Sequence, residues 1–237
     1  MTTLIFWGCL LLFAAATLSE RGAVGADDFR YVTGYAGPNY TGVHYQFTDY
    51  TPDLSVVQMD NTIQSACGVG IWMLYDTADY DLDHAWSVVC RYMAASWCAS
   101  MGTACNTSSL RYAGSPYGLN DNYYNLYEDT IYRGKEFRGN TNASDVGDLD
   151  MDVSSLVVTG QSPWTFYTGL HYTGANVCVY PYRHSTNNDI HLDFAYYDKM
   201  DYLGMPDNSI RSVARGCLSD RVLGHPGHER RGLDDIN

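Results

Sequence analysis

The sequence YEDTIYRG, at residues 127–134, places two tyrosines five positions apart and a glycine two positions after the second tyrosine. If these residues fold back on themselves, Tyr127 and Tyr132 can cover a small core together. Gly134 can then adopt a backbone conformation that a side chain would penalise. The stretch therefore predicts a tight, folded hairpin.

The same spacing recurs along the chain. YAGPNYTG at 35–42 and YTGLHYTG at 167–174 match it in full, whereas YDTADYDL at 75–82 keeps both rings and has Leu82 in place of the glycine. The four starts form two pairs, each with an internal spacing of about 40 residues. This arrangement predicts two duplicated domains.

Each copy closes on a short segment that ends in a serine: DNTIQS, ACNTSS, DMDVSS and DNSIRS. A ring at the start and a hydroxyl at the end, repeated four times, define a structural unit. The positions expected to be structural are Tyr35, Tyr40, Gly42 and Ser65; Tyr75, Tyr80 and Ser109; Tyr127, Tyr132, Gly134 and Ser155; and Tyr167, Tyr172, Gly174 and Ser212.

The segments between the turns alternate with period 2 and are rich in β-formers, as in VHYQF at 43–47 and NVCVY at 176–180. Many short strands with glycine and asparagine turns favour an all-β protein built of antiparallel sandwiches. We predict a first domain over 27–113, a linker over 114–122 that is rich in Gly, Pro, Ser and Asn, a second domain over 123–219 and a flexible tail over 220–237.

The amino-terminal region carries an apolar run of about 15 residues, LIFWGCLLLFAAATL, which suits the core of a secretory signal better than a membrane span. Small residues at Val24 and Ala26 favour cleavage before Asp27, with cleavage after ATLS as the alternative. We therefore predict a signal peptide over 1–26 and a secreted, extracellular protein. No later stretch predicts a transmembrane segment.

Six cysteines remain once Cys9 leaves with the signal, and an even number in a secreted chain predicts disulfides. The simplest partition joins Cys178 to Cys217 in the second domain. The first domain leaves three possible pairings open among Cys67, Cys90, Cys98 and Cys105. Three glycosylation triplets fit the same compartment, at Asn39, Asn106 and Asn142.

The formal net charge is −13, with 27 acidic and 14 basic residues. Without a run of basic residues, nucleic acid and heparin are poor partners. The acidity suits cations or basic surfaces, and it also describes the solvated face of an ordinary extracellular protein. Neither a particular partner nor an oligomeric state follows from the sequence.

The repeated hairpin, with its closing serine and endings such as DNSIRS, resembles the Greek key motif of the βγ-crystallin superfamily over about 185 residues. The resemblance implies two β-sandwich domains, each made of two interlocking four-stranded Greek keys. It also implies that each serine hydroxyl ties down the folded hairpin of its own motif.

The resemblance further implies candidate calcium ligands, because many members of this superfamily bind calcium through segments of the form [N/D]-[N/D]-x-x-[S/T]-S. Calcium prefers six to eight oxygen ligands. Every segment here departs from the pattern: Gln64 and Arg211 replace the coordinating hydroxyl, Met151 stands at the second place, and ACNTSS has no acid. The alternative is that these segments are only structural corners. Weak binding is most expected near Asp150 and Ser154, and the candidate ligands are Asp60, Asn61, Ser108, Asp150, Ser154, Asp207 and Asn208.

Other polar constellations are less specific. DIHLD places Asp189, His191 and Asp193 on one face of a strand, a geometry that suits either a metal or a solvated strand. The tail adds His225 and His228 and a dibasic pair, Arg230 and Arg231.

No G-x-S-x-G, H-E-x-x-H or phosphate-loop motif is present, so we expect a non-enzymatic structural or binding protein. One alternative is a secreted defence or toxin-associated binding module, because the superfamily occurs in pore-forming assemblies. Another is a secreted enzyme that uses the polar insertion at 183–201, which contains His184 and His191.

Overall fold

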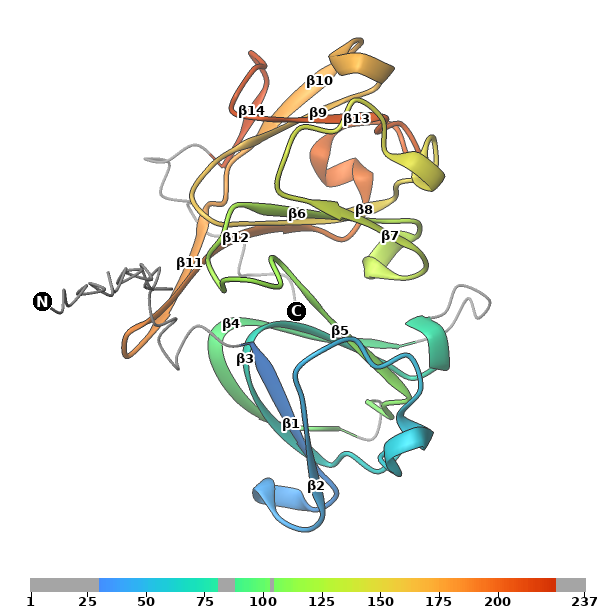
Figure 1. Cartoon of the computed structure of the whole chain (residues 1–237), viewed down its shortest axis with the longest axis vertical. Helices are drawn as coiled ribbons and strands as arrows, with labels where there is room; N and C mark the ends of the chain where they lie inside the picture. Colours follow the sequence, from blue (N-terminus) through green and yellow to red (C-terminus); the bar gives the residue numbers. More distant parts are fainter. Residues whose placement is uncertain (1–29, 81–87, 103–104, 225–237) are drawn as a thin grey trace, which may run out of the picture.

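The computed structural model of the protein describes residues 30–80, 88–102 and 105–224. Its residues form two lobes of β-sheet, one above the other in Figure 1, and the described ranges contain 3-10 turns but no α-helix. The all-β prediction is confirmed. The predicted signal peptide, Leu82, both tail histidines and the dibasic pair lie outside the described residues.

The first lobe is one five-stranded sheet that bends over itself. Its strands are β1 (Tyr31–Tyr35), β2 (His44–Phe47), β3 (Ser65–Tyr75), β4 (Val89–Ser100) and β5 (Ser109–Ala113). The order is β2-β1-β3-β4, and β5 pairs with β3 as well. The first half of β3 pairs with β1 and its second half with β5, and β4 follows its other edge throughout.

The second lobe contains two sheets. One has the order β11-β12-β8-β6-β7, and the other has the order β13-β9-β10-β14. Their strands are β6 (Tyr123–Tyr127), β7 (Glu136–Gly139), β8 (Ser155–Thr159), β9 (Trp164–Tyr167), β10 (Asn176–Val179), β11 (Arg183–Asn187), β12 (Ile190–Tyr197), β13 (Ser212–Arg215) and β14 (Val222–Leu223).

Short 3-10 turns connect these strands. They are η2 (Pro38–Tyr40), η3 (Leu54–Val57), η4 (Ala78–Tyr80), η5 (Thr130–Tyr132), η6 (Gly147–Leu149), η7 (Leu170–Tyr172) and η8 (Met200–Leu203). Four of them, η2, η4, η5 and η7, close the repeated tyrosine hairpins.

The strand connections are those of interlocked Greek keys. β12 belongs to the fourth repeat yet pairs with β8 of the third. Isolated β-bridges also pair residues of neighbouring repeats, joining Thr51 to Leu110 and Ala143 to Val213. Because the repeats of a pair contribute segments to each other's sheets, neither repeat can complete its core alone.

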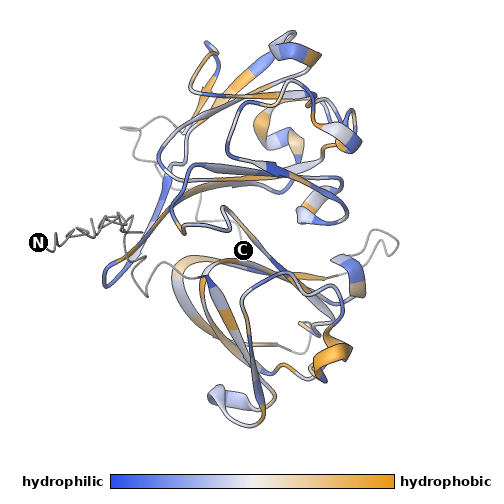
Figure 2. Cartoon of the chain, in the orientation of Figure 1, coloured by the Kyte–Doolittle hydropathy of each residue, from blue (hydrophilic) through white to orange (hydrophobic). Residues whose placement is uncertain are grey.

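Three hydrophobic clusters form the cores of the part of the chain that the structure describes. One lies inside the second lobe around Trp164 and Phe166, and one lies inside the first lobe around Trp72 and Leu54. The third joins the lobes, combining residues of β3, β4 and β5 with residues of β6, β8 and β12. The apolar residues in Figure 2 lie mostly along these strands, whereas the tip of the β11–β12 hairpin is hydrophilic.

The structure describes the carboxyl-terminal segment as far as residue 224, and two residues of the predicted tail, Val222 and Leu223, form β14. β14 pairs in parallel with β10, placing Val222 opposite Cys178. The strand covers an edge that β10 would otherwise leave open. Arg221 anchors it by donating to the carbonyls of Leu203 and Gly204.

The disulfide between Cys178 and Cys217 is confirmed. In the first lobe the structure selects one of the three open pairings and joins Cys67 to Cys98 and Cys90 to Cys105. Three disulfides are typical of an oxidising compartment. Among the described residues, no helix is long and apolar enough to cross a membrane.

Candidate functional site

The four hairpins share one geometry. In each, the two tyrosine rings meet edge to face, with centroids 5.6 to 6.0 Å apart. The second tyrosine has a positive φ, between 60° and 63°. Gly42, Gly134 and Gly174 have φ between 74° and 84°, the left-handed backbone that favours glycine and was predicted for Gly134.

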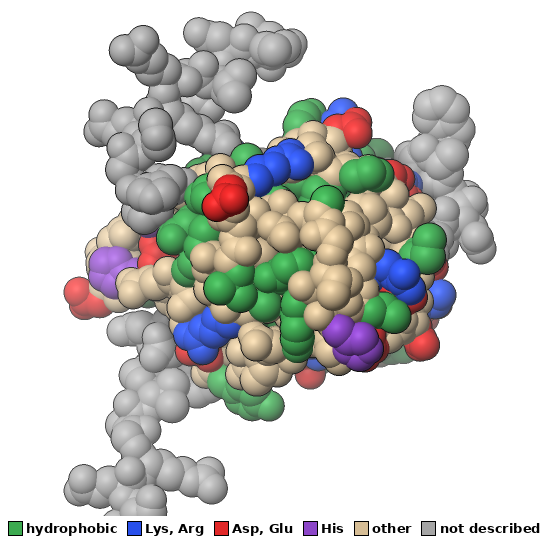
Figure 3. Space-filling view, turned by 90° about the horizontal axis from the view of Figure 1, so that it is seen from above, with side chains coloured by type: hydrophobic (Ala, Val, Ile, Leu, Met, Phe, Trp, Pro, Cys, Tyr) green, Lys and Arg blue, Asp and Glu red, His purple; other side chains and the backbone are tan. Residues whose placement is uncertain are grey.

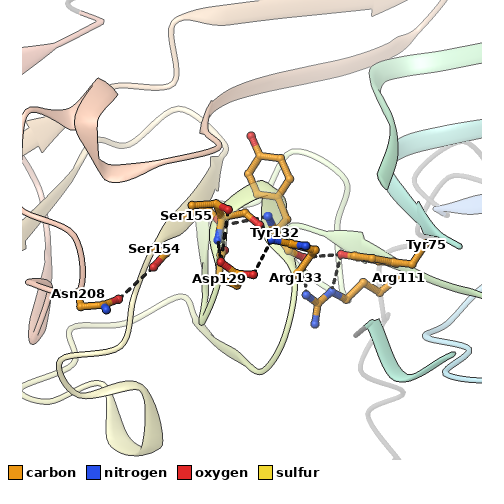
Figure 4. Close-up of polar contacts among 9 residues, drawn as sticks. Tyr75, Arg111, Asp129, Tyr132, Arg133, Ser154, Ser155 and Asn208 are labelled. Atoms are coloured by element: carbon orange, nitrogen blue, oxygen red, sulfur yellow. Dashed lines mark hydrogen bonds and ion pairs between the residues drawn. The ribbon is translucent and has the colours of Figure 1, made fainter. Parts of the chain in front are cut away.

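One serine fixes each hairpin from inside the fold. The Ser155 hydroxyl accepts the backbone N–H of Tyr132 at 3.0 Å and donates to the carbonyl of Asp129 at 2.6 Å, as Figure 4 shows. Ser65, Ser109 and Ser212 make the same two bonds in their own repeats. All four serines are fully buried. Their hydroxyls therefore satisfy the polar backbone groups that the strained corner exposes.

The candidate calcium segments lie beside these corners, and those of the second lobe meet each other. Asn208 donates its backbone N–H to the carbonyl of Val153, and Ser154 Oγ lies 3.0 Å from Asn208 Oδ1 (Figure 4). Ser154 is nearly buried, while Asp207 and Asn208 are exposed. The structure therefore brings a hydroxyl of one segment to an amide oxygen of the other.

Asp150 has a different partner. Both of its carboxylate oxygens accept hydrogen bonds from the Arg211 guanidinium, each at 2.7 Å. These bonds hold the pKa of the Asp150 carboxyl below its usual value. Arg211 occupies the place where the βγ-crystallin pattern has a coordinating hydroxyl, so it supplies a cation to a carboxylate that calcium would need. Asp150 and Ser154, both of the DMDVSS segment, thus contact different residues of the DNSIRS segment: Asp150 contacts Arg211, and Ser154 contacts Asn208.

The corresponding pair in the first lobe is less complete. Asn61 donates its backbone N–H to the carbonyl of Thr107, and its side chain donates to Asp60 at 3.1 Å. Ser108 is buried, and its backbone carbonyl accepts from Leu54. Asn61, Met151 and Asn208 all have positive φ at the second position of their segments, which explains structurally why asparagine suits that position.

The polar insertion of the fourth repeat, residues 183–201, contains both β11 and β12. Its face carries His184, whose Nδ1 lies 2.5 Å from Asp193 Oδ1, and His191, whose Nδ1 lies 3.1 Å from Thr186 Oγ1. Asp193 also bonds Asn120 of the predicted linker through both its carboxylate and its backbone N–H. Asp189 precedes the strand. The described residues contain no group of three or more histidine, cysteine or acidic side chains arranged to hold a metal.

The sequence patterns do not predict the buried arginine that lies between the lobes. Arg111 of β5 is 2% exposed and donates to the carbonyls of Tyr132 and Gly134, across the lobe boundary (Figure 4). Its guanidinium carbon lies 4.7 to 5.3 Å from the ring centroids of Tyr75, Tyr80 and Tyr127. The residue two positions after the closing serine is uncharged in the other three repeats, where it is Cys67, Val157 or Ala214. The charge at this position in the second repeat was the sequence feature that could have identified Arg111.

Tyr75 reinforces the same contact. Its hydroxyl donates to the Tyr132 carbonyl at 2.5 Å and accepts from Arg111 Nε at 2.9 Å. Burial raises the pKa of Tyr75 to about 12, so the phenol keeps its proton at neutral pH. Gly134 completes the junction by donating its N–H to the carbonyl of Tyr80. The hairpins of the second and third repeats therefore bind each other directly.

No protein-family model matches the chain, and no curated protein matches it either. Among solved structures, geodin, a beta-gamma crystallin from Geodia cydonium, is similar over 79% of this chain and 99% of its own, with 18% identity and a TM-score of 0.59. A beta gamma crystallin from Ciona intestinalis matches over 39% of this chain and 98% of its own, with 21% identity and a TM-score of 0.32.

Protein S, solved in complex with calcium, matches over 78% of this chain and 98% of its own, with 15% identity and a TM-score of 0.28. The similarity to geodin extends over both lobes and shows the fold: this chain has the βγ-crystallin Greek key fold.

Proposed function

Because this chain has the βγ-crystallin fold, we propose that it is a secreted, non-enzymatic structural or binding protein of the extracellular space. The apolar amino-terminal run and three disulfides support secretion. Asn39, Asn106 and Asn142 are exposed, as glycan acceptors need to be. Figure 3 supports the expectation that nucleic acid is a poor partner, because on that face the cationic side chains are scattered and form no basic patch.

The proposal includes weak calcium binding in the second lobe, and one observation carries it: Ser154 Oγ and Asn208 Oδ1, from opposite segments, lie 3.0 Å apart. Asp207 adds an exposed carboxylate next to Asn208. These are hard oxygen ligands of the kind that calcium prefers. Asp150 would add another carboxylate, but calcium must first compete with Arg211 for it, so we expect a dissociation constant of about 1 mM.

Calorimetric titration of calcium into the oxidised protein tests this proposal. The substitution Arg211→Ser frees Asp150 and places a hydroxyl at the coordinating position, so we expect affinity to rise at least about tenfold. Gln64→Ser is the matched control. It makes the same change in the first lobe, where the facing segment ACNTSS has no acid, and we expect no gain.

Ser154→Ala completes the set, since it removes a proposed ligand and leaves the Asp150–Arg211 pair in place. It should abolish the weak heat signal of the natural protein. An unchanged affinity in Arg211→Ser, or equal gains in Arg211→Ser and Gln64→Ser, would remove calcium from the proposed function.

A further inference from the structure

The Cys67–Cys98 disulfide differs from the other two in its place on the sheet. Cys67 of β3 and Cys98 of β4 lie directly opposite each other in an antiparallel pair, and β4 is an edge strand. Cys98 is exposed and Cys67 is half-buried. By contrast, Cys178 is fully buried in its bridge and Cys105 is 6% exposed in its own.

Thiol–disulfide exchange requires a thiolate to reach one sulfur along the line of the S–S bond, so access decides which disulfide reacts. Exposed bridges are the labile ones in proteins that also carry buried bridges. The half-buried Cys67 can leave as a thiolate once Cys98 is attacked, because it retains contact with water.

We propose that Cys67–Cys98 is a selective exchange site for small-molecule thiols, while the other two disulfides are structural. The attacking thiolate bonds to Cys98 Sγ, the S–S bond breaks, and Cys67 departs as a thiolate that takes a proton from water. The product is a mixed disulfide at Cys98. A second thiol can then displace Cys98, which releases the small molecule as its own disulfide and leaves two protein thiols, so that two small-molecule thiols supply the two electrons.

The bridge lies where the first lobe meets the β11–β12 hairpin. Two residues before Cys98, Ser96 receives a hydrogen bond from Asn187, and the N–H of Ala95 donates to Ser185 Oγ at 2.9 Å. Trp97 covers Gly68 and donates to the carbonyl of Gly70. Opening the bridge removes the covalent tie between β3 and the end of β4, so exchange at this site loosens the contact between β4 and β11.

The test treats the folded, oxidised protein with glutathione at about millimolar concentration and follows alkylation of each cysteine by peptide mass spectrometry. We expect Cys67 and Cys98 to be labelled at least about tenfold faster than the other four cysteines, with a glutathione adduct on Cys98. Simultaneous labelling of all six, earlier labelling of either other pair, or an adduct chiefly on Cys67 would overturn the proposal.

A second measurement separates local exchange from unfolding. In the Cys67→Ala, Cys98→Ala double variant, the other two bridges should be reduced at their slow original rates. Hydrogen exchange of the glutathione-treated protein should rise in residues 94–100 and 183–187 and stay unchanged in β9 and β10. Unchanged exchange at β4 and β11, or a rise throughout the chain, would contradict the proposed coupling.

Discussion

At the scale of single residues, the fold depends on four serines that each satisfy a donor and an acceptor of a strained corner. Removing Ser155 leaves the Tyr132 N–H and the Asp129 carbonyl without that partner inside the protein. We expect Ser155→Ala to lower the free energy of unfolding by about 2 kcal/mol, measured by urea denaturation. Ser100→Ala, at an exposed position at the end of β4, should change it little. Equal effects of the two substitutions would contradict this role of the serine.

The Asp150–Arg211 pair gives a pH-dependent prediction. Because the folded-state pKa of Asp150 is depressed, the pair stabilises the protein above the unfolded-state pKa of about 3.9, and this stability is lost as pH falls through the folded-state value. Asp150→Asn should therefore unfold at lower urea than the natural protein at pH 6, and the two should converge by about pH 2. A difference in the urea midpoint that grows on acidification would contradict the ion pair.

The spacing of these residues was visible in the sequence. The tyrosine–glycine periodicity predicted the hairpins, and the resemblance to the βγ-crystallin motif implied that the closing serines anchor them. The sequence did not show which residue each candidate calcium ligand contacts. Asp150 and Arg211, for example, come together only when the third and fourth repeats fold against each other. Local spacing carries no information on such a contact.

At the scale of elements, the central strands serve two cores at once. In β3, Trp72 and Leu74 face the first-lobe core, whereas Ile71 and Met73 face the cluster between the lobes. The register of β3 with β4 shifts between Val69 and Gly70, at the point where the partner on the other edge of β3 changes from β1 to β5. Alternation with period 2 is typical of strands that bury one face only. β3, β5, β6 and β8 are instead buried on both faces, since a second lobe covers the face that would otherwise meet water.

Gly70 is therefore a sensitive point in β3. Its φ is 90°, and an added Cβ would lie 2.9 Å from a Leu119 methyl carbon. We expect Gly70→Ala to cost at least about 2 kcal/mol of unfolding free energy, measured by urea denaturation. Gly102→Ala is the control, because no atom of the described residues, its chain neighbours apart, lies within 4 Å of the added Cβ. A neutral Gly70→Ala would show that the register shift does not depend on glycine.

At the scale of the whole molecule, the sequence predicted two domains and a linker, and those boundaries remain a prediction. Their close packing could not be predicted, because the apolar residues that form the cluster between the lobes look like ordinary core positions in sequence. Arg111 lies at the centre of this junction, where carbonyls and tyrosine rings surround its charge.

We expect the natural protein to unfold in a single calorimetric transition because the lobes share this cluster. Arg111→Ala should lower the unfolding free energy by about 3 kcal/mol and separate the transition into two, since it opens a cavity and leaves the Gly134 carbonyl without its donor. The exposed Arg215→Ala should do neither. Two separate transitions in the natural protein would contradict a shared core.

The most direct test of the proposed function is the melting temperature of the oxidised protein as calcium is raised to about ten times its expected dissociation constant. A ligand that binds only the folded state then stabilises it by about 1.4 kcal/mol, which raises the melting temperature by a few degrees. We predict this rise in the natural protein, a larger rise in Arg211→Ser and none in Ser154→Ala. A flat response in all three, or the same rise in Ser154→Ala as in the natural protein, would contradict a calcium site at Ser154 and Asn208.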